Sequence, residues 1–298
     1  MATSNQTKMA PDYITLLQNP NKLPLQYRVI RSMFKIFGTV APWPTWKFAA
    51  KIFFTPRTRK VRENEKEILD AGETKIIQLD ELDLFVTSWG YGDKRVLLLH
   101  GWGGNRAQMT PLVKELVDNN YQVIAFDAPA HGESGGSRTN MAKIVEAIHL
   151  VNDTYGRLDY VIGHSFGGAA LTVAIDRGLE VDKLITISTP SIMQRSVMKP
   201  FQSLLNLPDK VMRRINEKIS QIMGQTLEEF SAVNLAKSQT IPLLIVQDRQ
   251  DSVITKEDAI ELNNNWKDSE LYLTDGFGHR QILRENSVHL RIGHFLAS

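Results

Sequence analysis

The feature that most constrains this chain is residues 160–170, where an apolar run leads into the pattern Gly-x-Ser-x-Gly. The pattern predicts the end of a buried strand, a very tight turn with Ser165 at its tip, and the start of a helix. Gly163 and Gly167 supply the small residues that such a turn needs two positions before and after the serine. We therefore expect Ser165 to be exposed at a helix N-terminus, where the Phe166 N–H and the helix dipole favour negative charge.

Short apolar runs alternate with amphipathic helical segments from residue 75 onward. The expected strands are 75–79, 82–89, 95–100, 121–127, 158–163, 183–188, 242–247 and 270–274. The expected helices include 107–119, 139–154, 256–266 and a closing helix at 280–296. This alternation predicts an α/β fold with a mostly parallel sheet covered by helices on both faces.

One interval, from residue 189 to residue 240, contains no expected strand. Its leucines, isoleucines and methionines recur at helical spacing, which predicts a helical insertion at about residues 190–240. An insertion that follows the carboxyl end of a strand would lie over the sheet edge where ligands bind in open α/β sheets. We expect a cap or lid there.

A glycine-rich segment, His-Gly-Trp-Gly-Gly at residues 100–104, directly follows the strand expected at 95–100. Its glycines let the backbone turn so that the Trp102 N–H can point at the space above Ser165. Together with the Phe166 N–H, this gives two donors for a developing oxyanion, and one such donor is worth about 3–4 kcal/mol of barrier. Trp102 and Phe166 are thus the predicted oxyanion hole.

Two further segments follow later strands and carry an acid and a histidine. After the strand at 242–247, Asp248 stands at the strand end and Asp251 on the loop beyond, just before an apolar pair that can anchor it. We favour Asp251 as the acid, with Asp248 as the alternative. After the last strand, His279 lies in a glycine-rich loop that can present an imidazole across the strand ends.

The order Ser165, Asp251, His279 is the nucleophile–acid–base order of the α/β-hydrolase fold. From residue 75 to residue 298 the chain resembles the α/β-hydrolase superfamily, matching it at residues 100–102, 126–134 and 163–167, at the Asp251 loop and at residues 278–279. It departs at residues 247–248, where many relatives have His-Gly. The resemblance implies an eight-stranded sheet with a lid and an esterase-, lipase-, thioesterase- or peptidase-like activity, and residues 1–74 lie outside it.

These patterns lead to the hypothesis of a serine hydrolase that cleaves a carboxylic ester or thioester of an apolar acyl group through an acyl-enzyme. No metal and no organic cofactor is expected to be required, and the substrate is expected to be a small-molecule ester. The alternatives are peptide or carbon–carbon bond hydrolysis by the same triad, and a non-catalytic relative that only binds a ligand.

The net charge of +2 conceals a strong asymmetry: residues 1–62 hold eleven Lys or Arg and one acid, together with nine of the 24 aromatic residues. We interpret residues 1–74 as a basic aromatic helical arm with a linker, which either docks on the acidic hydrolase domain (75–298) or contacts an anionic membrane surface through residues 27–62. No nucleic-acid motif accompanies the charge, so no nucleic acid is expected as a partner.

Composition alone does not identify the cellular compartment, so the cytoplasm is the default expectation. The chain contains no cysteine, and its first residues lack the layout of a secretory signal. The longest uncharged run of the N-terminal arm, residues 36–46, is eleven residues long and contains two prolines, too short to span a membrane. We expect a cytoplasmic protein, with membrane association through the arm as the open alternative.

Overall fold

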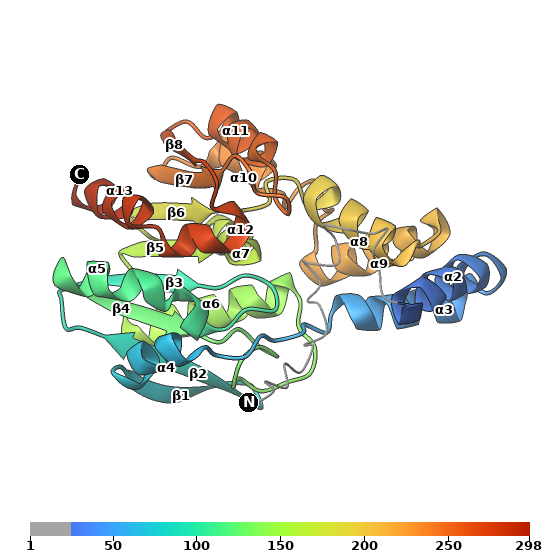
Figure 1. The fold of residues 1–298 in the computed structure, drawn as a ribbon, viewed down its shortest axis with the longest axis horizontal. Coiled ribbons are helices and arrows are strands. Elements are labelled where there is room, and N and C mark those ends of the chain that lie inside the picture. The colour runs from blue at the N-terminus through green and yellow to red at the C-terminus, as the bar shows by residue number, and fades with distance from the viewer. Residues whose placement is uncertain (1–24) are drawn as a thin grey trace, which may run out of the picture.

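The computed structural model describes residues 25–298, and its centre is an eight-stranded sheet in the order β1-β2-β4-β3-β5-β6-β7-β8 (Figure 1). The strands are β1 Glu73–Leu79, β2 Leu82–Trp89, β3 Lys94–Leu99, β4 Tyr121–Phe126, β5 Tyr160–His164, β6 Lys183–Ile187, β7 Leu243–Asp248 and β8 Ser269–Thr274. β2 is antiparallel to β1 and β4, and the other neighbouring strands are parallel. The predicted α/β-hydrolase fold with a mostly parallel sheet is confirmed.

Alternate residues of the central strands enter two separate apolar cores, one on each face of the sheet. In β3, Val96 and Leu98 join one core, and Leu97 and Leu99 join the other. The first face is covered by α4 (Glu63–Asp70), α5 (Val113–Asp118) and α13 (Asn286–Ala297). The second is covered by α6 (Met141–Tyr155), α7 (Phe166–Asp176) and α11 (Lys256–Asn265). Because both faces are buried, the strands read as continuous apolar runs.

Two of the expected helices are interrupted. The helix expected at 107–119 begins as a 3₁₀ helix, η2 (Arg106–Leu112), which contains Pro111 and becomes α-helical only from Val113. Proline has no N–H to donate, which accounts for an irregular first turn. The closing helix is divided into α12 (Gly278–Gln281), η5 (Ile282–Arg284) and α13 by the extended residue Glu285.

The insertion between β6 and β7 is helical, as expected. It contains the π-helical turn η3 (Gln194–Met198), α8 (Lys199–Leu205), α9 (Asp209–Met223), α10 (Ala232–Leu235) and the 3₁₀ turn η4 (Ala236–Ser238). The buried side of α9 carries Val211, Ile215 and Ile219, which are spaced one helical turn apart. We call α8 and α9 the cap.

The N-terminal helices α2 (Leu25–Val40) and α3 (Pro42–Phe53) pack against the cap rather than against the sheet (Figure 1). A Cβ atom on Gly38 of α2 would lie 2.7 Å from Cδ of Pro208, so only glycine fits this contact. The Phe53 and Phe201 rings meet edge to face with centroids 5.0 Å apart.

Residues 1–24 of the predicted arm lie outside the described residues. Within residues 25–298, no helix is long and apolar enough to cross the bilayer.

Candidate active site

Ser165 occupies the turn between β5 and α7, as the sequence predicts, with φ 53° and ψ −125°. Positive φ is unfavourable for a residue with a side chain, so the surrounding packing must impose it. A Cβ atom on Gly163 would lie 2.5 Å from the Gly168 backbone, and one on Gly167 would lie 2.5 Å from the His100 carbonyl oxygen. The two glycines therefore allow the helix and the neighbouring loop to approach closely enough to form the turn.

Ser165, His279 and Asp251 come from three distant parts of the chain and form one hydrogen-bonded line. The Ser165 Oγ lies 3.1 Å from Nε2 of His279, and Nδ1 of the same ring lies 2.8 Å from Oδ2 of Asp251. With the proton on Nδ1, the imidazole donates to the carboxylate and leaves Nε2 free to accept from the serine hydroxyl. His279 and Asp251 are buried, and Ser165 is partly exposed.

The two acids after β7 have different partners. Besides His279, Asp251 accepts N–H donors from Val253 at 2.8 Å and Ile254 at 3.0 Å. Burial acts to raise the pKa of the Asp251 carboxyl, but the His279 hydrogen bond and these donors bring the pKa below its ordinary value. Asp251 is therefore held as a carboxylate.

Asp248 binds the loop that carries the histidine, and no bond joins its carboxylate to the imidazole. It accepts from the Thr274 hydroxyl at 2.8 Å and from the N–H groups of Phe277 at 3.1 Å and Gln250 at 2.9 Å. Burial opposes ionisation here as well, but the backbone donors of Gly278 and Phe277 help to bring the pKa of Asp248 below its ordinary value. Asp248 thus fixes the position of the His279 backbone.

A second histidine holds the main chain of His279 in place. His164, the residue before the serine, donates from Nε2 to the main-chain oxygen of His279 at 2.8 Å. Burial lowers the pKa of His164 to about 3, so this ring is neutral at ordinary pH.

The loop that carries Trp102 is fixed by two other neutral histidines. Nε2 of His131 accepts from the Gly103 N–H at 3.0 Å, and Nε2 of His100 accepts from the Ala128 N–H at 3.1 Å. Burial lowers the pKa of His100 to about 4 and that of His131 to about 3. Phe166 is the first residue of α7, so its N–H has no acceptor within the helix. A Cβ atom on Gly101 would lie 2.8 Å from the Ser165 Cβ, so the Trp102 loop lies against the serine turn, which also carries the Phe166 amide.

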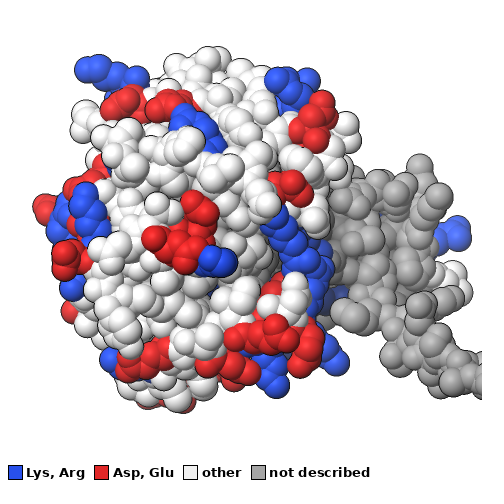
Figure 2. All heavy atoms as spheres, turned by 60° about the vertical axis from the view of Figure 1, so that its left-hand side comes forward, with Lys and Arg blue, Asp and Glu red and all other residues white. Residues whose placement is uncertain are grey.

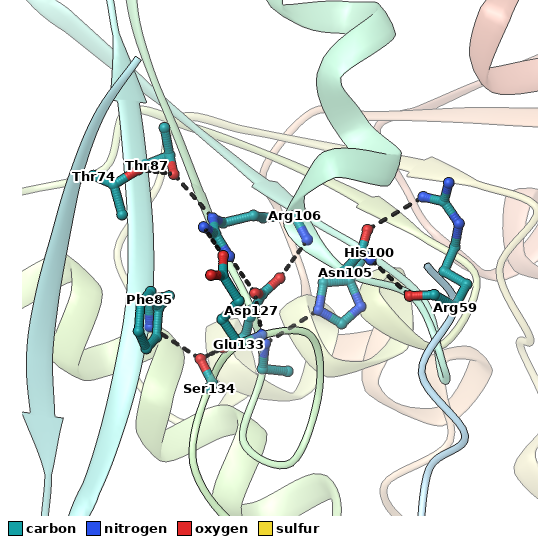
Figure 3. A network of polar contacts seen from close by, with 11 residues as sticks. Arg59, Thr74, Phe85, Thr87, His100, Asn105, Arg106, Asp127, Glu133 and Ser134 are labelled. Carbon is teal, nitrogen blue, oxygen red and sulfur yellow. Dashed lines mark hydrogen bonds and ion pairs between the residues drawn. The ribbon is translucent and has the colours of Figure 1, made fainter. Parts of the chain in front are cut away.

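An ion-pair network around the buried residues Arg106 and Asp127 holds the loop after β3 to the sheet (Figure 3). The Arg106 guanidinium pairs with Asp127 and Glu133 and donates to the Thr87 hydroxyl at 2.9 Å. Asp127 also accepts from the Arg106 N–H at 2.6 Å and the Glu133 N–H at 2.8 Å. Burial raises the pKa of Asp127, while Arg106 and these donors oppose the shift. Residues 126–134 are conspicuous in the sequence, but their link to Arg106 is a contact between separate loops and has no local signal.

The segment between α3 and α4 crosses this loop as well. The Arg59 N–H donates to the Gly103 carbonyl at 2.9 Å. Asn105 donates from its amide to the Arg59 carbonyl at 3.0 Å (Figure 3). The Arg59 side chain pairs with Glu65, a buried acid that also pairs with Arg284 at 2.7 Å. The N-terminal segment is therefore bonded to the loop that bears Trp102, which no local sequence pattern indicates.

Aromatic rings enclose the space beside the serine. Trp102 lies edge to face with Phe166, their centroids 5.3 Å apart, and stacks near Phe53 of α3 at 6.4 Å. The gap lined by His100, Trp102, Ile144, Phe166 and their neighbours is too narrow to admit even a water molecule. Ligand pockets are commonly about 300–1,000 Å³, so the site is closed. A larger, open hollow on the cap is lined mainly by polar side chains of residues 194–224 and by no residue of the loops that carry Ser165, Asp251 and His279, so we do not assign the chemistry to it.

The residues that the structure describes include no group of three or more His, Cys, Asp or Glu side chains arranged to hold a metal ion. The polar groups beside Ser165 are those of the hydrogen-bonded line and of the loops that support it.

A family profile for the alpha/beta hydrolase fold matches residues 94–218. Among solved structures, the Pyrococcus furiosus esterase Pf2001 superposes with a TM-score of 0.63 at 22% identity, covering 82% of this chain and 97% of that one. Together with the strand order of the sheet, both matches show that the chain has the α/β-hydrolase fold. It is also similar to the pimeloyl-[acyl-carrier protein] methyl ester esterases of Shewanella oneidensis and Shewanella woodyi. The identities are 31% and 33% over 159 residues, or 53% of this chain, and the matches span 57% and 58% of those relatives.

Proposed function

We propose that this α/β-hydrolase cleaves a carboxylic ester or thioester of an apolar acyl group through an acyl-enzyme on Ser165. The observation that carries the proposal is the unbroken hydrogen-bonded line from the Ser165 hydroxyl through His279 to Asp251. A serine, a base that reaches its hydroxyl, and an acid that orients the base form the arrangement that activates a serine for nucleophilic attack. The similarity to named ester hydrolases supports an ester as the substrate.

The first half-reaction follows from the positions of these groups. The Ser165 Oγ attacks the acyl carbon while its proton passes to Nε2 of His279. The carbonyl oxygen becomes an oxyanion, which the N–H groups of Trp102 and Phe166 would stabilise. When the tetrahedral intermediate collapses, the bond to the leaving alkoxide or thiolate breaks and that group takes the proton from Nε2. Asp251 stays ionised throughout and stabilises the imidazolium.

In the second half-reaction, water replaces the alcohol. His279 takes a proton from the water, whose oxygen attacks the acyl-enzyme, and the proton returns to Ser165 Oγ as the carboxylic acid leaves. The gap beside the serine turn, lined by Trp102 and Phe166, admits no water molecule and so has no room for an acyl chain. We therefore infer that substrate access requires movement of the rings over the site, Phe53 and Trp102 among them.

The proposal is tested with a panel of p-nitrophenyl esters, alkyl thioesters and peptide amides. We expect ester and thioester hydrolysis, with an initial burst of p-nitrophenol that matches the concentration of Ser165 sites, because the acyl-enzyme accumulates. Hydrolysis of amides alone, or ester hydrolysis that persists in Ser165→Ala, would contradict the proposal.

A further inference from the structure

The helix α2 exposes a continuous apolar face to solvent. Six large apolar side chains, each between 49% and 79% exposed, share this face: Leu25, Val29, Met33, Ile36, Phe37 and Val40. With about 100° of rotation per residue, they occupy a contiguous arc of about 120°. The side of α2 that packs on its neighbours is a different one and carries Phe34 and Gly38. About half or more of each of these six side chains therefore remains exposed while Phe34 and Gly38 pack against the neighbouring elements.

The apolar face extends onto α3. Trp43 and Phe48 are also exposed, and the Phe48 ring stacks on Phe34 of α2 with centroids 5.6 Å apart. We call these eight exposed residues of α2 and α3 the apolar face. It contains eight of the thirteen large apolar side chains that are exposed in residues 25–298, so the exposure is concentrated on two adjacent helices.

Cations border the apolar face. Arg28 and Lys35 are exposed on the flank of α2, and Lys47 of α3 lies with its Nζ 3.6 Å from the centre of the Trp43 ring. The two helices, residues 25–53, contain five Lys or Arg and no Asp or Glu. At the opposite end of the molecule, acidic and basic side chains are interspersed (Figure 2). The single-signed charge therefore coincides with the apolar face.

We propose that the apolar face of α2 and α3 binds to the surface of an anionic lipid bilayer. A helix that presents aliphatic and aromatic side chains beside a strip of Lys and Arg is suited to lie in the interface plane. There the apolar side chains enter the acyl boundary and the cations meet anionic headgroups. A second copy of the same face would bring cations against cations with no carboxylate on either side, so the charge disfavours a homodimer.

The position of the apolar face gives the binding a defined orientation. α2 and α3 lie at the end of the molecule that carries the cap, away from the strands β1 and β8 at the sheet edges (Figure 1). α3 ends at Phe53, whose ring lies against Trp102 beside the serine turn. A bilayer bound to the apolar face would therefore lie at the same end of the molecule as the candidate active site.

The test is vesicle cosedimentation of the full chain. Vesicles of phosphatidylcholine alone are compared with vesicles that contain about 30% phosphatidylglycerol. We expect at least about tenfold stronger partitioning to the anionic vesicles, and loss of most of this difference on going from about 0.1 M to about 1 M NaCl. The double variant Ile36→Ser/Val40→Ser should weaken partitioning at least about tenfold, because it removes apolar groups that enter the bilayer.

Two further variants separate the contributions. Lys35→Gln/Lys47→Gln should weaken binding to anionic vesicles at least about fivefold and leave binding to neutral vesicles unchanged. The matched control is Ile76→Ser/Leu290→Ser, whose apolar side chains are 52% and 54% exposed elsewhere on the surface and should have no effect. The thermal unfolding temperature of each variant confirms that it is folded.

Three outcomes would overturn the proposal. The first is wild-type protein that stays in the supernatant with anionic vesicles. The second is an equal loss of binding in the Ile76→Ser/Leu290→Ser control. The third is sedimentation velocity in which Ile36→Ser/Val40→Ser dissociates a dimer while vesicle binding is unchanged, which would assign the apolar face to a second copy of the chain.

Discussion

Three buried histidines that are neutral in the folded protein should make its stability fall steeply in mild acid. His100, His131 and His164 support the loops around Ser165, and burial lowers their pKa values to about 4, about 3 and about 3, from an ordinary value of 6.5. The perturbation is a change from about pH 7 to about pH 5. In this range the unfolded chain takes up protons on these residues and the folded protein does not, so the free energy of unfolding falls as the pH falls.

The size of the effect follows from these values. Between about pH 7 and about pH 5, the free energy of unfolding falls by about 2 kcal/mol for each such histidine, or by about 6 kcal/mol for the three. A domain is commonly stable by only about 5–15 kcal/mol, so this loss approaches unfolding. The raised pKa of Asp127 acts in the opposite direction, because the folded protein then binds a proton more readily than the unfolded chain. A single-residue comparison is therefore needed to isolate one histidine.

The assay is urea unfolding of the wild type and of His131→Gln at both pH values. Glutamine can place an acceptor oxygen near the position of Nε2, where the Gly103 N–H points, and it does not titrate. Any constant cost of the substitution cancels, and the wild type should lose about 2 kcal/mol more than the variant between the two pH values. The exposed His294→Gln serves as control. Equal losses in wild type and His131→Gln would refute the reasoning.

Three further expectations concern the site. Asp251→Asn should lower kcat for ester hydrolysis by about 10⁴-fold, because the correct imidazole tautomer is lost. Asp248→Asn should chiefly lower the melting temperature. Equal effects of the two substitutions on kcat would argue against Asp251 as the acid. Gly167→Ala should destabilise the protein by more than about 3 kcal/mol in chemical denaturation, because the new Cβ would meet the His100 carbonyl. The control substitution Gly293→Ala in α13 should be tolerated. Phe53→Ala should raise kcat/KM for longer acyl chains relative to acetate, and an unchanged chain-length profile would show that this ring does not limit access.

The sheet and the serine turn are the parts that the sequence predicts best, because their signals are local. Continuous apolar runs mark strands buried on both faces, and Gly163 and Gly167 are required by a turn only a few residues long. His279 could be selected because it follows the last strand, although it lies in the short helix α12 and not in an open loop. The catalytic roles of these residues stay predictions until activity is measured.

The choice of the triad acid and the packing of the N-terminal arm depend on contacts between segments that are far apart in the sequence. Asp248 and Asp251 are three positions apart on one loop, and only the folded positions of Phe277 and His279 show which carboxylate meets the imidazole. Likewise, the basic composition of the N-terminal arm does not show that Arg59 bonds to the loop after β3. Charge and periodicity predict helices in the arm. Whether these helices pack on the cap or on the sheet depends on how the folded surfaces fit together.

Labelling with a fluorophosphonate probe tests the central proposal most directly, because the probe reacts only with an activated serine. The wild type should be labelled at Ser165, and labelling should be lost in Ser165→Ala and in His279→Ala, since the line from Oγ to Nε2 is then broken. Circular dichroism confirms that both variants are folded. A folded wild type that does not react, or a Ser165→Ala protein that is still labelled, would contradict the assignment of Ser165 as the nucleophile.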